Sequence, residues 1–128
     1  MIYVDTSVLL AQLLAEDRRP PESLWKEPLI SSRLILYETW VRVNALKLSS
    51  SHGESTRALL SRLSLLELSP LVLTRALEPF PVPVRTLDAL HLASIEYLRE
   101  QRLSVRLASY DERMVAAGKR LRIEAVAL

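Results

Sequence analysis

The stretch IYVDTS, residues 2–7, sets three apolar residues, an acid and two hydroxyl residues in direct succession. An apolar run this short, closed by a charged residue, predicts a buried strand over residues 2–5. Residues 7–16 have helical spacing, and Thr6 or Ser7 is suited to cap that helix because a hydroxyl oxygen accepts a hydrogen bond from a free N–H group of the first turn. A strand, an acid and a helix in this order predict the first unit of an α/β fold.

The rest of the chain repeats this alternation of short apolar runs with longer helical periods. It predicts an α/β fold, one domain over residues 1–128, with a central parallel sheet of about five short strands flanked by helices. The further strands are expected at 29–31, 66–69, 104–108 and 122–126. The further helices are expected at 21–26, 33–48, 54–65, 70–78, 86–101 and 111–119, with a turn at His52-Gly53 and an extended loop at prolines 79, 81 and 83.

The composition excludes several kinds of site. The chain has no cysteine, which rules out disulfides, cysteine-ligated zinc and a cysteine nucleophile, and which is compatible with a reducing cytoplasm. The apolar run over residues 8–15 is far shorter than the roughly 20 residues that cross a bilayer, and the N-terminus lacks the basic region of a secretory signal. We therefore expect a cytoplasmic protein without membrane contact. The sequence also lacks the GxSxG, GxGxxG and P-loop motifs.

Arginine dominates the basic residues. The net charge is only +2, from 17 basic and 15 acidic residues, but 14 of the 17 are arginine. A guanidinium binds two phosphate oxygens at once, so this set suits a nucleic-acid partner. An arginine-rich codon bias in the source genome explains the composition equally well. The candidates to meet phosphate at the rim of a pocket are Arg18, Arg19, Arg85 and Arg113, because each lies near one of the acidic segments that follow or near its loops.

Two acids follow predicted strands and precede predicted helices. Asp5 closes the first strand, and Asp111 follows the strand at 104–108 in the same way. In open α/β sheets, ligands bind at the carboxyl ends of the strands. A plainer interpretation is that both acids are helix N-caps, a common role for aspartate.

Two further acids lie toward the N-terminal parts of helices. Glu38 shares a helical face with residues 34, 41 and 45, which puts a carboxylate on an apolar stripe that calls for a nearby cation. An ion pair with Arg42, one turn on, is the alternative. Asp88 lies in the first turn of the helix at 86–101, where it also stabilises the helix dipole.

The four acids together are stronger evidence for a functional site than any one of them alone. If these strand ends and helix starts meet at one edge of the sheet, four carboxylates converge there. Carboxylates that lie close together repel one another, and a hard divalent cation resolves that conflict. Magnesium and manganese prefer oxygen ligands. The sequence therefore predicts a Mg²⁺ or Mn²⁺ site formed by Asp5, Glu38, Asp88 and Asp111.

The same segments resemble a known family. IYVDTS at residues 2–7 resembles the start of PIN domains, and LYE at 36–38 is similar to the segment of their second acid. RTLDALHLA at 85–93 resembles the third-acid motif of VapC-type toxins, the PIN-domain ribonucleases of bacterial toxin–antitoxin pairs. SYDERM at 109–114 is similar to their fourth-acid segment. The resemblance covers essentially the whole chain.

This resemblance implies a metal-dependent endoribonuclease that leaves 5′-phosphate and 3′-hydroxyl ends and is neutralised by a small antitoxin protein. It implies metal-binding and catalytic roles for the four acids, with Asp111 favoured over its neighbour Glu112. Thr6, and less so Ser109, are candidate orienters of the acids. His91 is expected to be structural or to support a ligand rather than to bind the metal itself, because such sites prefer oxygen. His52 is expected to be a turn residue.

Two questions of partnership stay open in the sequence. The helices at 33–48 and 54–65 carry several large apolar residues, which favour a homodimer or antitoxin contact unless they simply form the core; these are Trp40, Leu46, Leu59, Leu60 and Leu63. The alternative function is a catalytically silent PIN-like module that binds RNA or protein.

Overall fold

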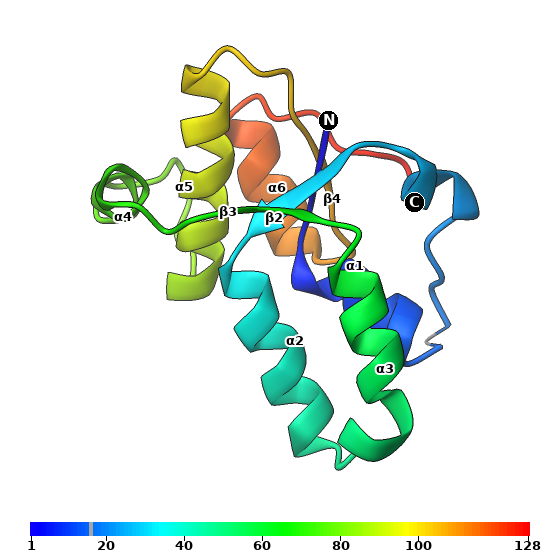
Figure 1. Cartoon of the computed structure of the whole chain (residues 1–128). Helices are drawn as coiled ribbons and strands as arrows, with labels where there is room; N and C mark the ends of the chain where they lie inside the picture. Colours follow the sequence, from blue (N-terminus) through cyan, green and yellow to red (C-terminus); the bar gives the residue numbers. More distant parts are fainter. Residues whose placement is uncertain (16) are drawn as a thin grey trace.

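The computed structural model describes residues 1–15 and 17–128, and its centre is a parallel sheet of four strands (Figure 1). The strand order is β3-β2-β1-β4, and every pairing is parallel. The predicted α/β class with a parallel sheet is thus confirmed. The strands are β1 (Ile2–Val4), β2 (Leu29–Ser32), β3 (Ser64–Leu66) and β4 (Arg106–Ala108).

The predicted fifth strand at 122–126 is wrong. That segment makes one isolated bridge, between Leu107 and Ala125. Arg122 has a φ of 61°, and the amide of Ile123 bonds back to the Gly118 carbonyl at 2.8 Å. The chain is therefore still turning out of the last helix where the strand was expected to begin. In this segment, only the pair Leu107 and Ala125 is therefore bonded as in a sheet.

Six α-helices and one 3₁₀ helix surround the sheet in the described part of the chain. Alternating residues of β1 divide the core: Ile2 and Val4 pack on one face, and Tyr3 packs on the other. The first face is covered by α1, η1, α2 and α3, and the second by α5 and α6. The elements are α1 (Thr6–Leu13), η1 (Glu22–Lys26), α2 (Leu34–Ala45), α3 (Ser49–Leu60), α4 (Pro70–Ala76), α5 (Thr86–Glu100) and α6 (Glu112–Arg120). The last residue of the helix predicted at 7–16 lies outside the described residues.

Helices α2 and α3 form an antiparallel pair that projects from the sheet (Figure 1). The turn between them lies at Lys47, which has a φ of 58°, and not at His52-Gly53 as predicted. Gly53 is instead buried within α3, close to Trp40 and Arg57. His52 is accordingly a helical residue, and its interpretation as a turn residue is wrong.

The topology brings four helix starts to one edge of the sheet. Helices α1, α2 and α6 each follow a parallel strand, so their first turns lie at the carboxyl edge. Helix α5 precedes β4 and runs back toward the start of that strand, so its first turn lies at the same edge. Figure 1 shows the start of α5 beside the start of α2. None of the helices in the described ranges is long and apolar enough to cross a membrane.

Candidate carboxylate site

Asp5 is buried at the end of β1 and is the N-cap of α1. Only 4% of the residue is exposed, and Oδ1 accepts hydrogen bonds from the Ser7 amide at 3.0 Å and from the Ser7 hydroxyl at 2.5 Å. The predicted cap, Thr6 or Ser7, is therefore wrong, because the acid itself caps the helix. Burial raises the pKa of the Asp5 carboxyl, while hydrogen bonds from Ser109 and Ser7 oppose this rise.

Ser109 joins Asp5 to Asp111 across 106 positions of sequence. Its hydroxyl donates to Oδ2 of Asp5 and accepts from the Asp111 amide at 2.9 Å. Ser7 makes a parallel link, since its hydroxyl accepts from the Tyr110 amide at 2.9 Å. Asp111 caps α6, with Oδ1 accepting from the amides of Arg113 and Met114. Ser7 was predicted only as a cap; its position directly after the Asp-Thr pair was the only signal of its part in this network.

Asp88 lies in the first turn of α5, and its side chain is 16% exposed. Its Oδ2 accepts from Nε of Arg85 at 3.2 Å. The same guanidinium donates through Nη2 to Oδ2 of Asp111 at 3.3 Å. Arg85 thus bridges two of the predicted site acids, a contact that the sequence pattern did not predict.

Glu38 contacts α1 and α5 rather than its own helix. Its Oε1 accepts from the Thr6 hydroxyl at 2.8 Å and lies 2.5 Å from Nε2 of His91. No ion pair with Arg42 forms among the described residues. The buried face of α2 is Ile35, Thr39 and Val43, while Val41 is exposed. The predicted apolar stripe is therefore wrong, and Glu38 lies at the border of the core, with 19% of its side chain exposed.

Hydrogen bonds through Arg85 and Ser109 join three of the four acids, and Glu38 shares a cleft with one of them. Glu38 and Asp88 line a shared cleft of about 340 Å³ together with Arg85, and Asp111 reaches both Arg85 and the Ser109 link to Asp5. Within the described residues, however, no three His, Asp or Glu side chains lie close enough together to hold a metal ion as they stand. Each acid is instead held by its own partners: Asp5 by hydroxyls and a helix amide, Glu38 by Thr6 and His91, and Asp88 and Asp111 by Arg85.

The donor chemistry of this network fits a hard divalent cation. Carboxylate and hydroxyl oxygens dominate it, and these are the ligands that magnesium and manganese take. Asp5 is the most telling residue, because its buried carboxylate forms no ion pair with any cationic side chain of the described chain. Burying a carboxylate without a counter-charge is unfavourable.

Positive side chains border the network on two sides. Arg113 lines a second cleft with Arg85 and Asp88. Arg18 donates to the Tyr110 carbonyl at 3.2 Å and lies over the Tyr110 ring, and Arg19 lines the same shallow cleft. All four arginines singled out from the sequence therefore lie near a site segment.

Comparison with known proteins gives consistent similarities. The sequence profile of the PIN domain matches residues 2–120. Ribonuclease VapC46 of Mycobacterium tuberculosis is 34% identical over a 140-residue alignment that covers 98% of this chain and 96% of that protein. Among solved structures, a chain of a toxin–antitoxin complex from Klebsiella pneumoniae is similar in fold, with a TM-score of 0.68 at 18% identity and 91% coverage of each chain.

Proposed function

The chain belongs to the PIN-domain family as a homologue of the VapC ribonucleases, and on that premise we propose that it is a Mg²⁺- or Mn²⁺-dependent endoribonuclease. Its catalytic and metal-binding residues are then Asp5, Glu38, Asp88 and Asp111. The substrate is RNA, and the products carry 5′-phosphate and 3′-hydroxyl ends.

The buried Asp5 carboxylate is the observation that carries this proposal. Two serine hydroxyls and one amide hold it in place, yet no cationic side chain of the described residues pairs with it. A purely structural cap needs neither this burial nor a charge, because asparagine caps a helix about as well. A metal ion supplies the missing counter-charge.

The acids and Arg85 have different roles in the proposed reaction. When bound, a divalent cation lowers the pKa of water and polarises the phosphoryl oxygen. Asp5 and Asp111 are held by Ser7, Ser109 and helix amides, so their orientation is fixed before the substrate arrives. The exposed guanidinium of Arg85 is placed to bind the RNA phosphate, which it can grip with two N–H groups.

Two partners follow from the same premise. We propose that a small antitoxin protein binds this chain, since a fold neighbour comes from a toxin–antitoxin complex. We further propose a homodimer that acts in the cytoplasm.

A silent module that binds RNA or protein without cleaving it is the alternative. Such a module has no need of the site acids, whereas all four are present here. Hydrogen bonds through Arg85 and Ser109 join Asp88, Asp111 and Asp5, and Glu38 lines the same cleft as Asp88. This favours the enzyme.

The test is cleavage of a structured RNA pool with Mg²⁺ or Mn²⁺, compared with EDTA. We expect cleavage by the wild-type protein that EDTA abolishes. Asp88→Asn should lower the rate about 100-fold or more, because changes even to the partners of metal ligands cost roughly 10–100-fold. Glu112→Gln removes the same charge at an exposed position of α6 and is the matched control, with an unchanged rate. Cleavage that persists in EDTA, or equal rates for both variants, would contradict the proposal.

A further inference from the structure

His91 connects three elements beneath the carboxylate site. It lies one turn after Asp88 on α5 and is 2% exposed. Its Nδ1 is 2.7 Å from the Tyr3 hydroxyl of β1, and its Nε2 is 2.5 Å from Oε1 of Glu38 on α2. The ring also packs edge-on against Tyr3, with 5.7 Å between the ring centroids. Both ring nitrogens are therefore occupied, and the plane of the ring is fixed.

The contacts around Tyr3 set the proton on this ring. The Tyr3 oxygen accepts a hydrogen bond from the Ser32 amide at 3.1 Å, which leaves its single proton to be donated. Nδ1 of His91, at 2.7 Å, accepts that proton, because Nε2 faces a Glu38 carboxylate oxygen that can only accept, and a neutral ring has a single proton. The neutral ring then carries its proton on Nε2 and donates it to Glu38, because the hydrogen bond at one nitrogen decides the state of the other.

Glu38 is held by one oxygen only. Its Oε1 accepts from both Thr6 and His91, whereas Oε2 has no hydrogen-bond partner among residues 1–15 and 17–128. Glu38 also lines the cleft that contains Asp88. One oxygen is thus anchored to the protein, and the other remains available at the cleft.

We infer that His91 is a positioning residue, which holds Oε1 of Glu38 through Nε2–H, in a tautomer set by Tyr3, so that Oε2 is kept ready for a divalent cation. This inference rests on the proposed function and adds the device that orients one of its ligands. Partners of this kind fix the rotamer of a ligand and typically alter metal affinity when they are changed. The plainer interpretation is a buried histidine that is hydrogen-bonded for stability alone.

Metal binding without RNA separates the two interpretations. Free Mn²⁺ is titrated by electron paramagnetic resonance, alongside thermal melts. His91→Leu removes the donor to Glu38 and should weaken Mn²⁺ binding about 10–100-fold. His91→Gln should recover most of that loss, since its amide nitrogen can donate in place of Nε2. His52→Gln, on α3, changes the other histidine of the chain and should leave Mn²⁺ affinity unchanged.

Tyr3→Phe tests the tautomer directly and is the variant least prone to unfold. In ¹⁵N spectra, wild-type His91 should show a protonated Nε2 and an unprotonated Nδ1. Tyr3→Phe should mix the two tautomers and weaken Mn²⁺ binding severalfold, less than His91→Leu does.

The outcomes are distinguishable. Wild-type protein that binds no Mn²⁺ overturns the proposed function together with this inference. Wild-type protein that binds Mn²⁺, with equal affinity in folded His91→Leu and Tyr3→Phe, overturns the positioning role alone, even where their melting temperatures fall. If His91→Leu does not fold, an unchanged affinity in Tyr3→Phe with mixed tautomers overturns it as well.

Discussion

At the scale of single residues, Asp5 combines two roles that the sequence left as alternatives. It is a helix cap through Oδ1, and through Oδ2 it belongs to the network that reaches Asp111. The two oxygens serve different neighbours, so the cap and the proposed metal ligand do not exclude each other. Substitutions that change one property at a time can separate them.

We expect Asp5→Asn to abolish cleavage, with a loss of about 100-fold or more, while the metal-free protein melts at the same or a higher temperature. Asparagine keeps the cap and removes a buried charge. Asp5→Ala also removes the cap and should lower the free energy of unfolding by about 1 kcal/mol. Thermal melts in EDTA beside cleavage assays measure both effects. An Asp5→Asn protein that is clearly less stable than wild type would count against the buried charge as a cost to folding.

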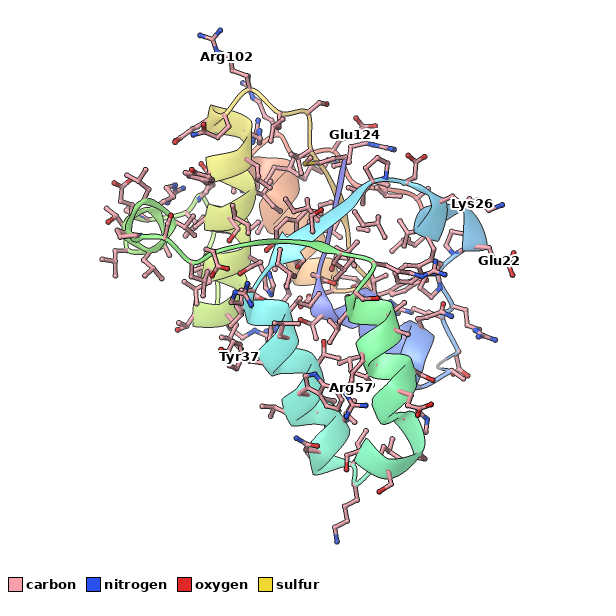
Figure 2. The ribbon with its side chains drawn as sticks, viewed as in Figure 1. Glu22, Lys26, Tyr37, Arg57, Arg102 and Glu124 are labelled. Carbon is pink, nitrogen blue, oxygen red and sulfur yellow. The ribbon has the colours of Figure 1, made fainter. Side chains whose placement is uncertain are left out.

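Arg85 allows a second prediction at this scale. Its guanidinium contacts the Asp88 and Asp111 carboxylates, so it competes with a cation for the same oxygens. We expect Arg85→Gln to tighten Mn²⁺ binding and to weaken RNA binding. The slope of log RNA affinity against log salt concentration should fall by about one, the value for a single lost phosphate contact. Arg102→Gln is the control, since Arg102 follows the far end of α5 and projects away from the fold (Figure 2). If Arg85→Gln weakens the binding of both Mn²⁺ and RNA, Arg85 does not compete with the cation for these carboxylates.

The places of Asp5, Asp88 and Asp111 could be predicted from local order, because each lies at a strand end or in the first turn of a helix. The surroundings of Glu38 could not, because the apolar stripe predicted around it does not form. The contacts of Arg85 and His91 could not be predicted either. Whether Nε2 of His91 reaches Glu38, 53 residues away, depends on how α5 and α2 pack, and no local spacing encodes that.

At the scale of elements, the sequence predicted the order of strands and helices but misplaced several boundaries. The turn between α2 and α3 shifted because the positive φ is adopted by Lys47, a residue with no turn signature, while Gly53 is an ordinary helical residue of α3. The expected strand at 122–126 failed for a similar reason, at Arg122. Non-glycine residues in the left-handed region are uncommon, so the pattern gives no warning of them.

An exposed ion pair joins the start of α2 to the end of β3. The Arg33 guanidinium contacts both carboxylate oxygens of Glu67, and this hydrogen bonding lowers the pKa of Glu67. The stabilisation is therefore present above the unfolded pKa of glutamate, about 4.3, and is lost as the pH falls through the folded pKa. We expect Glu67→Gln to lower the melting temperature slightly at pH 7, less in high salt, and not at all near pH 2.

Glu22→Gln is the matched control for this pair. Glu22 is exposed on η1 (Figure 2) and forms no ion pair within the described part of the chain. Its melting temperature should equal that of the wild type at both pH values. A Glu67→Gln effect that persists at pH 2 would show that something other than this ion pair is lost.

At the scale of the whole molecule, the surface predicted for a dimer is mostly core. Leu60 and Leu63 are buried, and Trp40 and Leu59 pack against the same cluster, with Trp40 also facing the Arg57 guanidinium. Only Leu46 remains exposed, at 40%. The plainer interpretation of these residues is therefore correct. The large exposed apolar side chains of α2 are instead Tyr37 and Val41, four residues apart on one face, and Figure 2 shows Tyr37 projecting outward.

If the chain forms the proposed homodimer, we expect Tyr37 and Val41 to lie in the interface. Val41→Asp should then convert the dimer to a monomer in sedimentation, because an unpaired charge is costly to bury. Leu46→Asp, on the surface first predicted, should leave the dimer intact. A dimer that survives Val41→Asp but dissociates with Leu46→Asp would reverse this assignment.

The place of β1 in the sheet has a consequence for how the protein is made. Strand β1 is synthesised before both of the strands that flank it, β2 and β4, so the sheet stays incomplete until residues near 108 have been added. The hydrogen bond between Ser109 and Asp5 likewise cannot form until residue 109 has been added. Contacts this distant in sequence form late. A nascent chain released early would thus carry the first acid without Ser109 and Asp111, and we expect it to lack the proposed carboxylate site.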